Sequence, residues 1–130
     1  MSSPHPDTRQ RALVAAGAAS AKKGEDIVIL EVGPIIAIID CFVLVSAANT
    51  RQVRTIVDEV EQAMREHDGS RPIGFEGLDD ATWVLLDYGD IVVHVFVTDT
   101  RAFYDLDRLW ADAAREVFEE QAEAAPQASR

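Results

Sequence analysis

Cysteine is almost absent from this sequence, which contains a single one, Cys41, so no internal disulfide can form. A long hydrophobic run is absent as well. The longest apolar stretch, residues 35–45, is interrupted by Asp40 and falls well short of the roughly 20 residues that a membrane-spanning helix needs. The N-terminus lacks the apolar segment of a secretory signal peptide. These absences favour a cytoplasmic protein that does not enter a membrane.

Positive charge is also scarce. There are 12 lysines and arginines against 23 aspartates and glutamates, which gives a net charge of −11. General binding to a nucleic-acid backbone needs a basic surface, so little direct nucleic-acid binding is expected. The segment from Pro72 to Thr100 has no lysine or arginine and holds six carboxylates: Glu76, Asp79, Asp80, Asp87, Asp90 and Asp99. Its negative potential would attract a basic partner, although an acidic surface kept for solubility explains the same residues.

The motifs of common catalytic and metal sites are missing. The sequence has no glycine-rich phosphate loop, no H-E-x-x-H, no EF-hand pattern and no Cys/His cluster. Cys41 is expected to be a buried, inert thiol, and His94 a hydrogen-bonded core residue. The turn at residues 46–51 is a candidate anion site at a helix N-terminus, but capping by Asn49 or Thr50 explains it better. We therefore predict no catalytic residue, cofactor or metal.

Residues 82–97 are the most informative stretch of the chain. Two apolar runs flank Asp87-Tyr88-Gly89-Asp90, a four-residue segment that is typical of a β-hairpin turn. The second run, residues 91–97, is apolar on both faces, as in a strand at the middle of a sheet covered on both sides. The hairpin is therefore expected to form the core of the protein, with Tyr88 at its exposed tip.

The remaining pattern predicts a single α/β domain over residues 8–119, built as a mixed β-sheet flanked by helices. Strands are expected at residues 26–32, at 73–76 and within 35–46, where one bent strand and two short strands both fit. Residues 1–7 are expected to be a disordered leader, and the chain to end in a disordered tail over residues 120–130. Helices are expected at residues 8–23, 51–67, 101–110 and 112–123.

The string W-x-x-x-D-x-G-D-x-x-x-H-x-F runs through the hairpin from Trp83 to Phe96. With Glu76-Gly77 and residues 101–110, this string resembles the Iojap family, the ribosomal silencing factors. The resemblance extends over residues 12–110 and also includes residues 24–28, 40–43 and 51–54.

The resemblance implies a nucleotidyltransferase-like fold without known transferase activity. It also implies a translation repressor that binds a basic protein of the large ribosomal subunit at the face used for subunit joining. By family resemblance, this partner is protein fourteen of the large subunit. Occupying that face would keep the small and large subunits apart. Whether the chain acts as a monomer or as a homodimer stays open.

Aromatic side chains beside carboxylates are suited to binding a basic protein, because the rings supply contact area and the acids select the partner. We expect five residues to form the partner-binding surface: Trp83, Asp87, Tyr88, Asp90 and Tyr104. In the alternative, Trp83 and Tyr104 simply fill the core.

A second hypothesis is a nucleotidyltransferase-type enzyme acting on a small molecule or a protein. Such enzymes use a Gly-Ser pair after an early strand and a D-x-D pair that holds magnesium. This chain has Ser46-Ala47-Ala48 at the first position, which departs from the family pattern and leaves the role of the turn open. Its D-x-D, Asp105-Leu106-Asp107, is predicted within a helix. A regulatory domain of the anti-sigma-antagonist type is supported only by the strand at residues 26–30.

Overall fold

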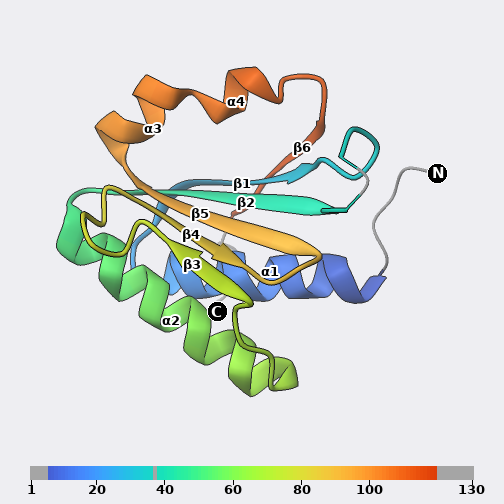
Figure 1. Cartoon of the computed structure of the whole chain (residues 1–130), viewed down its shortest axis with the longest axis horizontal. Coiled ribbons are helices and arrows are strands. Elements are labelled where there is room, and N and C mark those ends of the chain that lie inside the picture. The colour runs from blue at the N-terminus through green and yellow to red at the C-terminus, as the bar shows by residue number, and fades with distance from the viewer. Residues whose placement is uncertain (1–5, 37, 120–130) are drawn as a thin grey trace, which may run out of the picture.

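Helices cover both faces of a six-stranded sheet in the computed structural model, which describes residues 6–36 and 38–119 (Figure 1). Adjacent strands follow the order β3-β4-β5-β2-β1-β6; β2 and β5 are parallel, and the other pairs are antiparallel. The predicted mixed sheet flanked by helices is confirmed. The elements are α1 (Pro6–Ala21), β1 (Glu25–Glu31), β2 (Cys41–Ala47), α2 (Thr50–Asp68), β3 (Gly74–Glu76), β4 (Trp83–Asp87), β5 (Ile91–Val97), α3 (Thr98–Tyr104), α4 (Leu106–Leu109) and β6 (Ala114–Val117).

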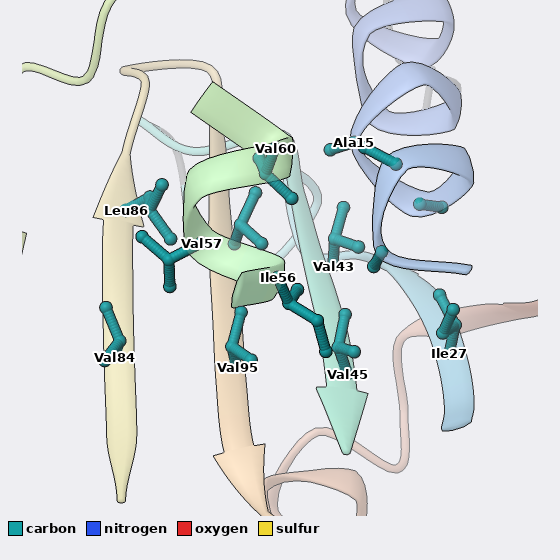
Figure 2. Packing of buried hydrophobic residues seen from close by; sticks show 14 of the residues in the cluster. Ala15, Ile27, Val43, Val45, Ile56, Val57, Val60, Val84, Leu86 and Val95 are labelled. Carbon is teal, nitrogen blue, oxygen red and sulfur yellow. The ribbon is translucent and has the colours of Figure 1, made fainter. Parts of the chain in front are cut away.

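The two central strands, β2 and β5, are buried on both faces because their side chains are apolar at successive positions. One row faces α1 and α2 and belongs to the larger core cluster, with Val93 and with Val43, Val45 and Val95, which are labelled in Figure 2. The alternate row faces α3 and α4 and belongs to a second cluster, with Phe42, Leu44, Val92 and Phe96. The predicted hairpin, β4 and β5, therefore lies within the core of the sheet.

Helix α2 has defined caps at both ends. Asn49 precedes it, and the Oδ1 atom of Asn49 accepts a hydrogen bond from the Gln52 backbone N–H at 2.9 Å. The Gln52 side chain accepts from the backbone N–H of Ala48, the residue before the cap, at 2.7 Å, which adds a second bond at this helix end. The predicted capping role of this turn is confirmed. The apolar stripe of α2 is buried against the sheet: Val53, Ile56, Val57, Val60 and Met64.

The C-terminal part of the domain differs from the prediction. The expected single helix at residues 101–110 is broken at Asp105, whose φ of 52° ends α3 and precedes α4. The expected helix at residues 112–123 is wrong, because residues 114–117 form strand β6 and pair with β1. The free edge of β1 offers backbone hydrogen bonds that outweigh the weak helical preference of this segment.

The bounds of other elements also differ from the prediction. Helix α1 begins at Pro6, so the predicted leader of residues 1–7 extends two residues too far. Among the described residues of the segment 35–46, a single strand forms. It begins at Cys41 and is preceded by a turn in which Ile35 and Ile36 donate to the Val32 carbonyl. Residues 1–5 and the predicted tail, residues 120–130, lie outside the described residues.

Candidate partner-binding surface

Three aromatic side chains meet on the sheet face that α3 and α4 cover. Trp83 is the first residue of β4, and its indole stacks on the Phe96 ring at a centroid distance of 4.9 Å. The Tyr104 ring, from the end of α3, lies 4.8 Å from the Trp83 ring, and Phe103 lies edge-on to Tyr104 at 5.0 Å. Trp83 is half-buried, whereas Tyr104 is 52% exposed and Phe103 is 80% exposed. We call Trp83, Phe103 and Tyr104 the aromatic patch.

Carboxylates lie on β3 and in the loop after it, next to the strand that carries Trp83. Glu76 on β3 pairs with Leu85 on β4, so its side chain lies on the same face as Trp83. The loop after Glu76 runs against β4, because a Cβ atom at Gly77 would lie 2.0 Å from the Trp83 carbonyl oxygen. This loop carries the exposed Asp79 and Asp80. Arg54 on α2 donates to the carbonyl oxygens of Leu78 and Asp79 at 3.1 and 2.9 Å, which anchors the loop.

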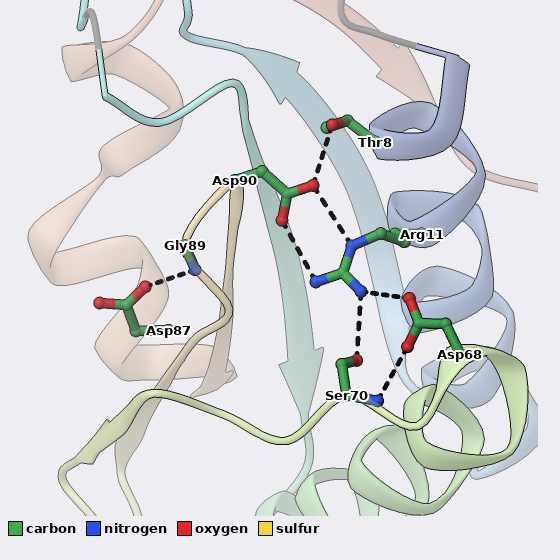
Figure 3. Close-up of polar contacts among 7 residues, drawn as sticks. All are labelled: Thr8, Arg11, Asp68, Ser70, Asp87, Gly89 and Asp90. Carbon is green, nitrogen blue, oxygen red and sulfur yellow. Dashed lines mark hydrogen bonds and ion pairs between the residues drawn. The ribbon is translucent and has the colours of Figure 1, made fainter.

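The hairpin tip is held by a polar cluster on the opposite sheet face (Figure 3). Asp90 accepts hydrogen bonds from the Thr8 hydroxyl at 2.9 Å and from Nε and Nη2 of Arg11, each at 3.2 Å. Arg11 also donates to Asp68 and Ser70 at the end of α2. Asp90 therefore ties the hairpin to α1 and, through Arg11, to α2. A carboxylate so engaged is a structural anchor.

Tyr88 does not lie at an exposed tip, and that prediction is wrong. Its side chain is 6% exposed, belongs to the larger core cluster and lies below the Arg11 guanidinium, 5.7 Å from the ring centroid. Burial raises the pKa of its hydroxyl to about 12. Asp87 accepts a hydrogen bond from the Gly89 N–H at 2.8 Å, which shapes the turn so that Tyr88 points inward.

The five predicted site residues thus separate into two groups. Trp83 and Tyr104 are in contact; Trp83 packs against the second core cluster and is half-buried, whereas Tyr104 is exposed. Tyr88 and Asp90 serve the packing of the hairpin tip. Asp87 is half-buried at the last position of β4, on the same face as Trp83 but at the other end of the strand.

Phe103 is the prominent surface residue that the sequence analysis did not include. In a single helix over residues 101–110, helical spacing would place Phe103 on one face with Leu106 and Trp110. The break at Asp105 ends that spacing, so Leu106 and Trp110 pack on the second core cluster while Phe103 points outward. An aspartate between two apolar segments was the one indication of a break, since aspartate tolerates the left-handed conformation.

The residues that the enzyme hypothesis would need are engaged with each other. Arg101 is buried, donates to the Ser46 hydroxyl at 2.9 Å and forms two hydrogen bonds to Asp107 at 3.0 and 3.1 Å. These bonds, together with one from Arg115, hold the pKa of Asp107 down at about 2. Asp105 caps α4 by accepting from the Arg108 N–H. Instead of forming a metal-binding pair, Asp105 and Asp107 shape and fasten the α3–α4 segment.

Other kinds of site are not apparent in the described part of the chain. Its histidine, cysteine, aspartate and glutamate side chains form no group of three that is suited to a metal ion. Cys41 is 1% exposed, and burial raises the pKa of its thiol to about 12, as expected of an inert core cysteine. Among residues 6–36 and 38–119, no helix is long and apolar enough to cross a membrane.

Comparison with known proteins identifies relatives of this chain. The chain matches, over residues 5–130, the family model described as "Ribosomal silencing factor during starvation". A ribosomal silencing factor of Bacillus subtilis is 40% identical over 100 residues, which cover 77% of this chain and 84% of the relative. The Mus musculus protein named "Mitochondrial assembly of ribosomal large subunit protein 1" is 30% identical over 92 residues, 68% of this chain and 40% of that protein.

A solved structure has the same fold. The crystal structure of a protein from Chromobacterium violaceum aligns with a TM-score of 0.76 and 28% identity, covering 88% of this chain and 95% of that one. The family resemblance predicted from the hairpin string is confirmed. With a family model matched from residue 5 onward and a relative 40% identical over most of its length, the chain belongs to the ribosomal silencing factor family.

Proposed function

We propose that this protein binds a basic protein of the large ribosomal subunit at the face used for subunit joining, keeps the two subunits apart and so represses translation. Protein fourteen of the large subunit is the proposed partner. The family name supports the silencing of ribosomes, and the name of the mouse relative supports a link to the large subunit. The cytoplasm, where ribosomes work, remains the predicted compartment.

The observation that carries this proposal is the aromatic patch. Phe103 and Tyr104 expose large apolar rings to solvent, although folding normally buries such surface. Trp83 supports Tyr104 from below, so the patch is anchored on the sheet. Rigid aromatic rings lose little conformational entropy on binding and are the commonest energetic centres of protein interfaces.

Charge near the patch selects the kind of partner. Glu76, Asp79, Asp80 and Asp99 are exposed on or next to the elements that carry the three rings, and no lysine or arginine occurs between residues 72 and 100. An acidic surface of this kind attracts a basic protein and repels the ribosomal RNA that surrounds it. The contact is therefore expected to be made to protein.

Co-sedimentation with separated ribosomal subunits tests the proposal. The wild-type protein should pellet with the large subunit and not with the small one, and should reduce the yield of joined ribosomes when both subunits are mixed. Phe103→Ala and Tyr104→Ala should each weaken large-subunit binding by roughly 1–4 kcal/mol and leave folding nearly intact, since both side chains are exposed.

Ile38→Ala provides the matched control. Ile38 is an apolar residue as exposed as Phe103, at 81%, and lies in the β1–β2 connection beside the hairpin tip, away from the patch. This variant should bind like the wild type. Equal binding of the wild type to both subunits, or to neither at low salt, would refute the proposed function. If Phe103→Ala and Tyr104→Ala bound fully, the surface would be wrong even with the partner right.

A further inference from the structure

His94 lies at the centre of β5, below the aromatic patch. Its side chain is 4% exposed and packs among rings, with centroid distances of 4.7 Å to Phe42 and 6.0 Å to both Trp83 and Phe96. A polar residue in such a place needs a reason, because an apolar side chain of similar size would pack there without polar atoms to satisfy.

One hydrogen bond connects His94 to the surface. The Nε1–H group of the Trp83 indole donates to Nδ1 of His94 at 3.1 Å. An indole nitrogen can only donate, so Nδ1 must carry a lone pair and the proton of the neutral ring must lie on Nε2. Burial lowers the pKa of His94 to about 4, which keeps the ring in this neutral form at the pH of the cytoplasm.

The other ring nitrogen of His94 carries a cost in stability. Nε2 is buried and has no hydrogen-bond partner among the described residues. A buried N–H without an acceptor lowers stability, and a phenylalanine at this position would avoid that cost. The feature that a histidine adds here, and a phenylalanine would not, is the acceptor at Nδ1.

That acceptor acts on a residue of the proposed binding surface. Trp83 is half-buried between Phe96, which stacks on one side of the indole, and Tyr104, which is exposed. Ring stacking alone does not determine which edge of the indole points into the core. The hydrogen bond to Nδ1 fixes which edge of the indole points inward, and hence which edge meets Tyr104.

We propose that His94 is a positioning residue, which holds the Trp83 indole in the single orientation that supports Tyr104 at the partner-binding surface. The proposal rests on the proposed function for its effect on ribosome binding. The hydrogen bond itself belongs to the free protein, so the two ideas can fail separately.

Two substitutions of His94 distinguish this positioning role from simple packing. His94→Phe keeps a ring and removes the acceptor, whereas His94→Asn keeps an acceptor close to the place of Nδ1. His94→Phe removes the unpaired Nε2–H but leaves the indole N–H without its acceptor, so its stability should stay close to that of the wild type near neutral pH. It should nevertheless bind the large subunit about three- to tenfold more weakly. His94→Asn should recover most of that binding, even where it is less stable. In a Trp83→Phe background, which lacks the indole donor, His94→Phe should not weaken large-subunit binding any further.

Nuclear magnetic resonance of the free protein gives a readout that does not depend on the ribosome. The indole N–H signal of Trp83, assigned with Trp83→Phe, should show slow exchange with solvent in the wild type and in His94→Asn, and fast exchange in His94→Phe. Unchanged exchange in His94→Phe would overturn the proposal. So would a loss of binding that follows stability equally in both His94 variants. If the wild type bound no large subunit, the proposed function would fail while this measurement still decided the role of His94.

Discussion

The ring and the hydroxyl of Tyr88 are expected to contribute very differently to the free energy of unfolding. The ring fills the core below Arg11, while the hydroxyl has no hydrogen-bond partner among the described residues. Tyr88→Phe keeps the ring and removes the orphaned group, so we expect a change in unfolding free energy within about 1 kcal/mol and of either sign. Tyr88→Ala removes the ring and should cost about 3–5 kcal/mol. Urea unfolding of both variants measures the difference; a loss well above about 1 kcal/mol in Tyr88→Phe would show that the hydroxyl makes a hydrogen bond in the folded protein.

His94 should make stability depend on pH. Its pKa is lowered to about 4 in the folded protein, against the ordinary value of 6.5 in the unfolded chain. As the pH falls below 6.5, the unfolded chain takes up a proton that the folded protein refuses, so the free energy of unfolding falls until about pH 4. The contribution of this residue is about 3 kcal/mol over that range.

The comparison with His94→Phe isolates this effect from the titration of carboxylates, which both proteins share. Denaturant unfolding between pH 7 and pH 4 should show the wild type losing stability more steeply than the variant. If the unfolding free energies of the two proteins fell in parallel with pH, His94 would be protonated without cost in the folded state, contrary to its burial.

Some residues were predictable and others were not, for a physical reason. The burial of Cys41 and His94 follows from strands that are apolar on both faces, a pattern visible within ten residues of sequence. The direction of Tyr88 depends on Arg11 and Thr8, which bond the tip from about eighty positions away along the chain. Local turn chemistry predicted the turn itself correctly, but could not reveal that α1 covers it.

Among the elements, α2 and the hairpin were predictable because their caps, turns and apolar periodicity all agree. The α3–α4 segment and β6 were not. A period of 3.6 residues cannot be followed across Asp105, where the backbone turns left-handed, and β6 forms only because β1 offers it an unpaired edge. The exposure of Phe103, and with it part of the candidate surface, was lost in the same error.

The β3–β4 connection should be intolerant of any side chain at Gly77. This residue has a φ of 88°, and a Cβ atom there would lie 2.0 Å from the Trp83 carbonyl oxygen. Gly77→Ala therefore combines backbone strain with a clash that displaces β4 at Trp83. Gly69, which ends α2 with a φ of 77°, has no atom within 4 Å of such a Cβ and provides the matched control.

Gly69→Ala should cost about 1 kcal/mol, the strain of the left-handed conformation alone. Gly77→Ala should lose a further 1–3 kcal/mol or so and alter the indole N–H signal of Trp83, because the clash reaches its backbone. Thermal or urea unfolding of the two variants gives the first comparison. Similar losses at both glycines would indicate that the connection yields without moving β4.

Over the whole molecule, the two faces of the sheet differ in how completely helices cover them. The face under α1 and α2 is closed by the larger core cluster and fastened at the hairpin tip by Asp90 and Arg11. The other face is covered by two short helices, which leave Phe103 and Tyr104 exposed above Trp83. The layered architecture was predictable because residues 91–97 are apolar on both faces, but the position of the surface depends on how α3 and α4 lie across the sheet.

Net charge should govern how fast this protein finds its partner. At −11, with exposed carboxylates on β3, in the loop after it and on α3, association with the proposed basic partner should be accelerated by long-range attraction that salt screens over about 8–10 Å. Large-subunit binding should therefore weaken as salt rises, mainly through a slower association rate. Asp79→Asn with Asp80→Asn should lower that rate and reduce its salt dependence, since both acids are exposed in the loop whose first residue, Gly77, lies against the Trp83 backbone.

Phe103→Ala is the contrasting variant, because it removes short-range contact area and leaves the charge unchanged. It should speed dissociation and keep the salt dependence of the wild type. Binding kinetics on immobilised large subunits, at low and at physiological salt, distinguish the two effects. Association rates independent of salt would contradict a basic partner, and would leave the aromatic patch to act on an uncharged surface.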